Sequence, residues 1–275
     1  SERKEHQVLL LCPDYLPLSS IYPYWEKHKG KLFPNVEVIS LPSESFMGVK
    51  FERNLSKKAR RPLQQALETF TPDVIHVDDP DRIFLGLRKA PGVAYASANN
   101  ISCVGFYHTN FIDYIEDFLP LPKPIIRGIQ WFSMLFIRPV FHAYDIILTA
   151  SPVTQQRLEQ LQVINAMCDR YLGVDTQTFK SQPKQPNFFQ TQYDIRNIED
   201  KTKLVFIGRL TPDKGWHFTL KALAALKKHN SYADKIVCLI VGEGKLREKI
   251  GKTLLDLGIE AHFFVRVPPN FFPAL

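Results

Sequence analysis

The chain has 275 residues, and its 35 Lys and Arg against 28 Asp and Glu give a net charge of +7. Hydrophobic residues make up 45% and charged residues 23%, which excludes a disordered, collagen-like or mucin-like chain. The length allows one large α/β domain or two domains of about 100–150 residues each. The modest charge, without zinc-finger spacing, an aromatic RNA-binding signature or a long basic arm, argues against a nucleic-acid partner.

The four cysteines lie far apart and form no C-x-x-C pair. This spacing is typical of buried free thiols in a reducing compartment, so we expect a cytoplasmic protein. The chain begins with Ser1 instead of Met and ends at Leu275, directly after a strand-like run. We therefore expect both ends to be truncated, and a removed organellar targeting segment stays an open alternative.

Apolar runs and helical patterns alternate along the first part of the chain. Short apolar runs predict buried strands at 7–12, 36–41, 74–77, 102–107 and 145–150. Helical spacing predicts helices at 53–70, 125–141 and 153–161. Strands separated by helices, without tight hairpin turns, predict a parallel sheet covered on both faces.

The predicted helix at 125–141 is unusually apolar, but Arg127 and Arg138 interrupt it short of the about 20 apolar residues that span a membrane. Two interpretations are open: a helix buried in the core, or an interfacial helix with Trp131 at a lipid surface. The basic cluster at 57–61 likewise indicates either a solvated helix face or a patch for phosphate or lipid headgroups.

The composition changes between 181 and 201, where Gln, Pro, Asn and Asp dominate, and this change predicts a linker. After it, strands are predicted at 204–207, 236–241 and 261–265, with helices at 216–228 and 245–257. We therefore predict an α/β fold with two Rossmann-like parallel-sheet domains, at 1–180 and 202–275, the second incomplete.

The clearest chemical pattern follows the strand at 204–207, where Gly208, Arg209, Lys214 and Gly215 precede a helix. Strand ends that face a helix N-terminus form the ligand crevice of open α/β sheets. Gly208 lets the backbone approach a ligand, and the two cations stabilise charge on a departing nucleoside diphosphate. The alternative is a surface turn with incidental cations.

A second glycine turn contains Gly242, Glu243 and Gly244, with Arg247 where a dinucleotide motif has its third glycine. An isolated G-x-G is weak, so a turn that contacts a nucleotide and a plain turn are both open. The sequence 79–81 spells D-x-D, whose oxygens suit a divalent cation. We favour a solvated turn or an acceptor-side polar contact there, and predict no metal site.

Several motifs together resemble the retaining, GT-B-type glycosyltransferases of family four (glycosyl transferases group 1). They occur in the family's order, at 72–77 (PDVIHV), 107–111 (YHTNF), 149–152 (TASP), 173–176 (GVDT) with Phe179, 208–215 (GRLTPDKG) and 241–244 (VGEG). The resemblance covers about residues 70 to 250.

The resemblance implies a hexosyltransferase that moves a sugar, with retention of configuration, from a nucleoside-diphosphate-sugar to an acceptor. The first domain would bind the acceptor and the second the donor. His108 would be the catalytic residue beside the transferred sugar. The other site residues implied are Gly208, Arg209 and Lys214 for the diphosphate, Gly242, Glu243 and Gly244 for the nucleotide, and Asp79, Thr109 and Asn110 on the acceptor side. No metal and no cofactor are expected.

Three departures from the family pattern stand out. The loop at 12–20 has no Gly, Val265 stands where Gly is usual, and the family's downstream acidic segment is absent. We therefore expect this chain by itself to be inactive. A non-catalytic relative that binds only a nucleotide, a sugar or a partner is the open alternative, whereas a nicotinamide-dependent oxidoreductase is disfavoured because no complete G-x-G-x-x-G follows the first strand.

The acceptor is expected to be a lipid or a carbohydrate. The apolar helix at 125–141 and the basic cluster at 57–61 would suit docking on an anionic membrane. We therefore expect either a cytoplasmic protein or a peripheral protein on the cytoplasmic face of a membrane.

Overall fold

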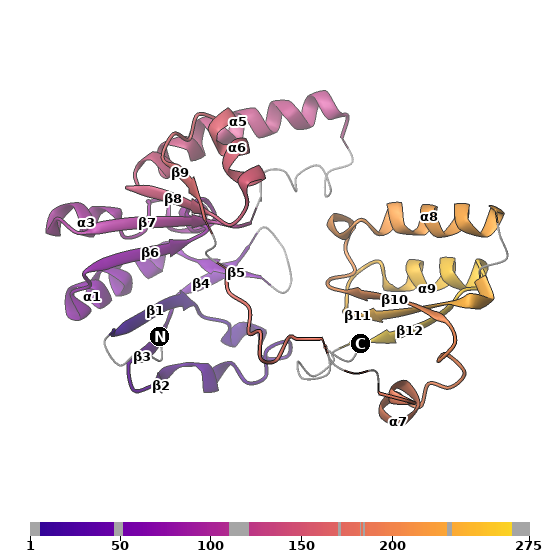
Figure 1. Cartoon of the computed structure of the whole chain (residues 1–275). Coiled ribbons are helices and arrows are strands. Elements are labelled where there is room, and N and C mark those ends of the chain that lie inside the picture. Colours follow the sequence, from indigo (N-terminus) through magenta and orange to yellow (C-terminus); the bar gives the residue numbers. More distant parts are fainter. Residues whose placement is uncertain are drawn as a thin grey trace. The chain divides into compact units, whose positions relative to one another are not determined.

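The computed structural model describes residues 6–46, 52–109, 121–169, 172–181, 183, 185–229 and 233–265. The described residues divide into two compact units: the first comprises those up to Leu172 except Leu121, and the second comprises Leu121 and those from Gly173 onward. Each unit contains a parallel sheet with helices packed on it (Figure 1). This arrangement confirms the predicted α/β class with two Rossmann-like parallel-sheet units.

The largest sheet of the first unit has four parallel strands in the order β6-β7-β8-β9. These strands are β6 (Val74–Asp78), β7 (Ser102–Tyr107), β8 (Ile146–Thr149) and β9 (Ala166–Cys168). The helices that precede or connect them are α1 (Arg60–Phe70), α2 (Pro80–Leu87), α3 (Val93–Asn99), α5 (Lys123–His142) and α6 (Pro152–Gln160). Because all four strands run the same way, the residues after β6, β7 and β8 meet at one edge of the sheet.

The beginning of the first unit departs from the purely parallel arrangement predicted. Strand β1 (Val8–Pro13) pairs parallel with β3 (Val36–Leu41), but β2 (Gly30–Phe33) joins β3 antiparallel. Strands β4 (Ser43–Ser45) and β5 (Arg53–Leu55) form a separate antiparallel pair. Short 3₁₀ helices lie at Leu16–Leu18, Trp25–His28 and Lys57–Ala59.

The predicted helix at 53–70 was wrong over its first four residues, because the 3₁₀ helix begins at Lys57 and continues into α1 at Arg60. Arg53 lies in a strand, where its guanidinium donates to the Oγ and the carbonyl oxygen of Ser43 at 3.0 and 2.8 Å. These contacts join residues ten positions apart, so helical spacing within the segment does not reveal them.

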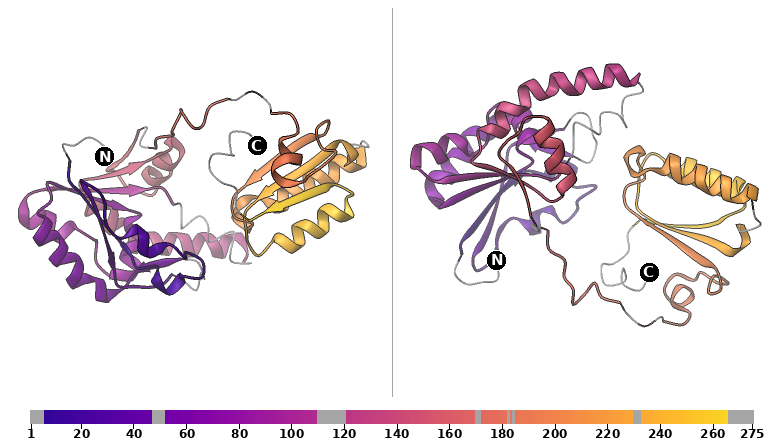
Figure 2. Two further views of the ribbon diagram at one scale, coloured as in Figure 1. Left: turned by 90° about the horizontal axis from the view of Figure 1, so that it is seen from below. Right: turned by 45° about the horizontal axis from the view of Figure 1, so that its top comes forward.

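The second unit has a three-stranded parallel sheet between helices (Figures 1 and 2). Its strands are β10 (Thr202–Ile207), β11 (Ile236–Val241) and β12 (Glu260–Phe264), in the order β10-β11-β12. Helices α8 (Trp216–His229) and α9 (Arg247–Asp256) lie on one face and α7 (Phe188–Tyr193) lies on the other, with 3₁₀ turns at Pro212–Lys214 and Ala233–Lys235.

Every residue of β11 is buried, so its alternate side chains serve two cores. Cys238 and Ile240 belong to the core beneath α8 and α9, whereas Leu239 packs with Phe188 and Phe189 of α7. Part of the segment predicted as a linker, 181–201, is therefore packed against the second sheet. Burying each of the two phenylalanines contributes about 1.5–3 kcal/mol of apolar transfer free energy.

Helix α5 shows features of both interpretations drawn from the sequence. One face is buried in the first unit, through Ile126, Ile137 and Phe141. The opposite face exposes large apolar side chains, with Trp131 65% exposed and Phe136 59% exposed. Among the described residues, no helix is long and apolar enough to cross a membrane.

Candidate functional site

The first candidate site lies at the carboxyl ends of β6 and β7. Because Asp78 of β6 pairs in register with Phe106 of β7, the residues that follow the two strands lie side by side. Asp79 follows β6 directly, and His108 and Thr109 follow β7. The structure therefore brings together three predicted site residues that are 29 and 30 positions apart in the chain. The predicted acceptor-side residue Asn110 lies outside the described residues.

Asp79 is buried and uses its backbone and its side chain to connect β6 with the loop after β7. Its N–H donates to the carbonyl oxygen of Phe106 at 2.8 Å, and its own carbonyl accepts the N–H of Ile83 at 3.1 Å. Its Oδ1 accepts the backbone N–H groups of His108 at 3.3 Å and Thr109 at 3.1 Å. The side chain is thus committed to the backbone of the loop that carries His108.

The His108 imidazole is partly exposed and lies over the same edge of the sheet. Its Nε2 is 3.8 Å from Oδ2 of Asp79 and 4.0 Å from Oδ1 of Asp78. Its ring centroid is 5.0 Å from that of Phe106, and its Nδ1 is 3.4 Å from the hydroxyl of Thr109. An imidazole held between carboxylates and open to solvent on one side is suited to hydrogen bonding with a hydroxyl group or a developing charge.

Asp81, the other aspartate of the D-x-D sequence, is only 1% exposed. Neither of its carboxyl oxygens has a hydrogen-bond partner among the described residues, although the N–H groups of Asp81 and Arg82 partly offset the loss of water. Burial, reinforced by the charge of Asp79, raises the pKa of Asp81 to about 7. Across the described part of the chain, no three His, Cys, Asp or Glu residues are grouped to hold a metal ion.

The second candidate site lies at the carboxyl end of β10. Gly208 has a φ of 147°, and a Cβ atom built on it would meet no atom of the described residues within 4 Å. Both predicted cations turn back onto one carboxylate, because Arg209 Nη2 and Lys214 Nζ each lie 3.4 Å from Oδ2 of Asp213. Gly215 follows in the left-handed conformation at φ 70° and leads into α8. The turn thus combines a glycine with free space around its Cα and two cationic side chains that share one carboxylate partner.

The Asp213 side chain, only 1% exposed, was missed by the sequence reasoning. Although burial raises its pKa, the Thr211 hydroxyl and the charges of Arg209 and Lys214 lower it further, and the net result lies below the usual value. The sequence did contain one indication of this contact, because Asp213 has cations four positions before it and one position after it, at Arg209 and Lys214. Its burial depends on tertiary packing, which the sequence does not show.

The glycines of the second turn are required by the first turn. A Cβ on Gly242, whose φ is 141°, would lie 2.0 Å from the carbonyl oxygen of Gly208, and one on Gly244 would lie 2.4 Å from that of Leu210. Main-chain hydrogen bonds join the turns, since Leu210 donates to the Glu243 carbonyl at 2.9 Å and accepts from the Leu246 N–H at 3.0 Å. These contacts explain the G-x-G spacing by backbone packing, and a nucleotide contact at 242–244 stays a prediction.

Glu243 is paired within the same turn, through Arg247 Nη1 at 2.8 Å. The guanidinium of Arg247 also lies over the ring of Phe263, 4.9 Å from its centroid. The arginine in the place of the third glycine therefore fastens this turn to β12.

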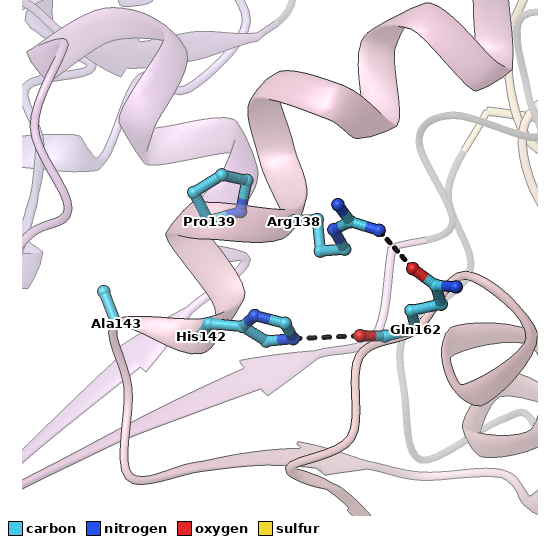
Figure 3. Close-up of a pocket in the computed structure, with 5 residues that line it drawn as sticks. All are labelled: Arg138, Pro139, His142, Ala143 and Gln162. Carbon is cyan, nitrogen blue, oxygen red and sulfur yellow. Dashed lines mark hydrogen bonds between the residues drawn. The ribbon is translucent and has the colours of Figure 1, made fainter.

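A cavity of about 560 Å³ lies elsewhere in the first unit, at the carboxyl end of α5 (Figure 3). Its polar groups bond to one another: Arg138 Nη1 donates to Oε1 of Gln162 at 2.5 Å, and His142 Nε2 lies 2.9 Å from the Gln162 carbonyl oxygen. None of the predicted site residues that the structure describes lines it.

Two family models match the chain. The model described as Glycosyltransferase Family 4 matches residues 2–178, and the model described as Glycosyl transferases group 1 matches residues 189–269. Together the two models include both strand-edge sites. Comparison with curated protein sequences gives no significant match.

Among solved structures, the chain is similar to the trehalose-6-phosphate synthase OtsA, with 10% identity, a TM-score of 0.54, and 98% of this chain and 75% of that chain covered. It also matches WaaG, a glycosyltransferase involved in lipopolysaccharide biosynthesis, with 14% identity, a TM-score of 0.49, and 96% and 71% covered. A third match is the catalytic domain of cholesterol-alpha-glucosyltransferase from Helicobacter pylori, with 29% identity, a TM-score of 0.21, and 24% and 40% covered. The chain thus spans two fifths of that last protein, and the likeness to OtsA shows a shared fold.

Proposed function

The chain belongs to the family described as Glycosyltransferase Family 4, and from this membership we propose that it transfers a sugar from a nucleoside-diphosphate-sugar to an acceptor hydroxyl with retention of configuration. The observation that carries the proposal is the turn after β10, where Arg209 and Lys214 gather beside the open Gly208. Two cations and an unobstructed backbone suit a diphosphate, whose oxygens gain charge as the sugar leaves.

In the proposed reaction, the bond between the anomeric carbon and the diphosphate oxygen breaks, and the nucleoside diphosphate leaves with the electron pair. The acceptor oxygen forms the new bond to the anomeric carbon on the same face, and its proton passes to the departing diphosphate oxygen. Positive charge develops on the sugar ring in between. His108, beside Asp78 and Asp79, would hydrogen-bond a sugar hydroxyl or stabilise this charge. Gly242, Glu243 and Gly244 would contact the nucleotide.

The donor site is tested by titrating the chain with UDP, GDP and ADP. We expect Arg209→Ala to weaken binding of the preferred nucleotide by about tenfold or more, because a charged hydrogen bond contributes about 1.5–3 kcal/mol. The matched control is Arg196→Ala, which removes an exposed arginine of the same unit that pairs with Asp194. Equal affinity in the Arg209→Ala variant and the wild type would refute the assignment.

Because this chain by itself is expected to be inactive, turnover is tested with a chain extended by the family's downstream acidic segment. Release of the nucleoside diphosphate is followed with a panel of nucleotide-sugars in the presence of carbohydrate and lipid acceptors. Because Arg209 and Lys214 supply the positive charge in this proposal, we expect equal turnover with and without EDTA. Binding of a nucleotide without turnover of any donor would favour the alternative, a relative that binds but does not catalyse.

We propose further that the acceptor side works at an anionic membrane surface on the cytoplasmic face. The outer face of α5 supports this, because Trp131, Phe132 and Phe136 are exposed beside Arg127, and the 20 residues of α5 include no acidic residue. Exposed aromatic rings with basic flanks are typical of interfacial helices. The acceptor would then be a lipid, and a soluble carbohydrate is the other candidate.

Membrane contact is tested by sedimentation with vesicles of phosphatidylglycerol and, separately, of phosphatidylcholine. We expect binding to the anionic vesicles only, and loss of most of that binding in Trp131→Asp. Phe218→Asp is the control, because Phe218 is a 78% exposed aromatic residue of α8 in the second unit. Equal loss in both variants, or no loss in either, would contradict docking through α5.

A further inference from the structure

We propose that Asp79 is a positioning residue, which holds the loop of His108 and Thr109 in the geometry required for transfer. The proposal rests on the proposed function, in which His108 contacts the transferred sugar. It assigns to Asp79 a role through His108 and no contact with the substrate itself.

The hydrogen bonds of Asp79 support this role. Strand β7 ends at Tyr107, so the N–H groups of His108 and Thr109 have no strand partner from the ladder with β6. Both N–H groups point to Oδ1 of Asp79, at 3.3 and 3.1 Å. A carboxylate that accepts two backbone N–H groups forms stronger hydrogen bonds than a neutral acceptor does. The carboxylate therefore fixes the backbone on which the imidazole is carried.

The second oxygen of Asp79 faces the imidazole itself. Oδ2 lies 3.8 Å from Nε2 of His108, and the Phe106 ring lies against the imidazole at 5.0 Å between centroids. One side chain thus orients both the backbone and the ring of His108. Asp78 approaches the same Nε2 at 4.0 Å, but its side chain is 66% exposed and accepts neither of the two N–H groups.

The backbone of Asp79 makes a clean substitution series available. Its φ of 45° and ψ of 64° place it in the left-handed region, which Asp, Asn and Gly enter more readily than other residues. Asp79→Gly keeps this conformation and removes the acceptor oxygens. Asp79→Asn keeps the conformation and one acceptor oxygen but removes the charge. A purely conformational role for Asp79 predicts that both variants resemble the wild type.

The structural measurement is amide hydrogen exchange by NMR at His108 and Thr109. We expect exchange about tenfold faster or more in Asp79→Gly, and close to wild type in Asp79→Asn. Asp73→Gly is the control, because Asp73 is exposed and precedes the opposite end of β6. Unchanged exchange at both amides in Asp79→Gly would overturn the proposal. If that variant does not fold, the two amide proton resonances must shift upfield in Asp79→Asn, and their constancy would overturn it.

The kinetic measurement uses the chain extended by the family's acidic segment and a donor that its wild-type form turns over. We expect Asp79→Gly to lower kcat by about tenfold to a hundredfold, because misplacing a group by about 1 Å has such effects. The KM for the donor should stay within about twofold, because Asp79 belongs to the unit that does not carry Arg209 and Lys214. Asp79→Asn should recover most of kcat. Absence of turnover by the wild type would count against the proposed function alone, since the exchange measurement decides the role of Asp79 independently.

Discussion

The strand-edge sites of the two units each contain a buried aspartate, but its partners differ. In the first unit, Asp79 accepts two neutral backbone N–H groups. In the second, Asp213 lies between the side chains of Arg209 and Lys214. Neutral partners leave the first edge negative, whereas the two cations leave one positive charge in excess at the second. The same position in a parallel sheet thus suits donors such as sugar hydroxyls in one unit and an anion in the other.

The backbones of the two edges differ as well. The turn after β6 contains Asp79 at φ 45°, a conformation that an L-residue adopts at modest cost. The turns after β10 and β11 contain Gly208 and Gly242 at φ 147° and 141°, where only glycine is comfortable. The first edge is therefore held by a side chain and the second by main-chain packing.

The largest effect should come from Gly242→Ala. Its new Cβ would lie 2.0 Å from the Gly208 carbonyl oxygen in addition to the unfavourable φ, so we expect a loss of about 4 kcal/mol or more in the free energy of unfolding. Gly208→Ala has a similar φ but open space around its Cβ, and should lose about 1–2 kcal/mol. Urea denaturation compares them, and equal losses would show that the close packing of the two turns has no energetic weight.

The next effect concerns Asp81. Its raised pKa, about 7, means that the folded protein retains a proton which the unfolded chain releases from about pH 4 upward, so stability falls as the pH rises through 7. The neighbouring ionisable groups are Asp79, Arg82 and Tyr144. The asparagine of Asp81→Asn cannot ionise. We therefore expect the free energy of unfolding of this variant to exceed that of the wild type by about 2–4 kcal/mol at pH 8.5.

At pH 4 the Asp81→Asn advantage should disappear, because the wild-type carboxyl group is then neutral too. Thermal unfolding at the two pH values measures it. A pH-independent difference between variant and wild type would contradict the buried, unpartnered state of Asp81.

The smallest effect, with the opposite sign, concerns Asp213. Its lowered pKa means that its ion pairs stabilise the fold above about pH 4, and that this stabilisation is lost as the pH falls through the lowered pKa. Because water screens the half-exposed cations, Asp213→Asn should cost at most about 1 kcal/mol at pH 7, and this cost should decrease as the pH falls through the lowered pKa. Asp194→Asn, an exposed aspartate paired with Arg196, is the control. A gain in stability at pH 7 would refute the pairing seen at this edge.

The sequence predicted the elements whose signals are local. The strands at 102–107 and 236–241 coincide with β7 and β11, because a continuous apolar run is enough to define a buried strand. Strand β5 was missed because its three residues depend on Ser43, and α7 was missed because two phenylalanines lie among polar residues typical of a linker. In the site, Arg209 and Lys214 were predicted from the turn, but the burial of Asp213 and the approach of Asp79 to His108 arise only in the folded chain.

The hydrogen bonds that join the turns after β10 and β11 also matter for engineering. Leu210 bonds to both Glu243 and Leu246, and the carbonyl of Gly208 fills the space that a side chain on Gly242 would need. If only one of these two turns were replaced by that of a relative, the new main chain would pack against a turn whose hydrogen-bonding groups and glycines do not match it. A chimera that replaces this edge of the sheet must therefore exchange 208–215 and 242–247 together, as one unit.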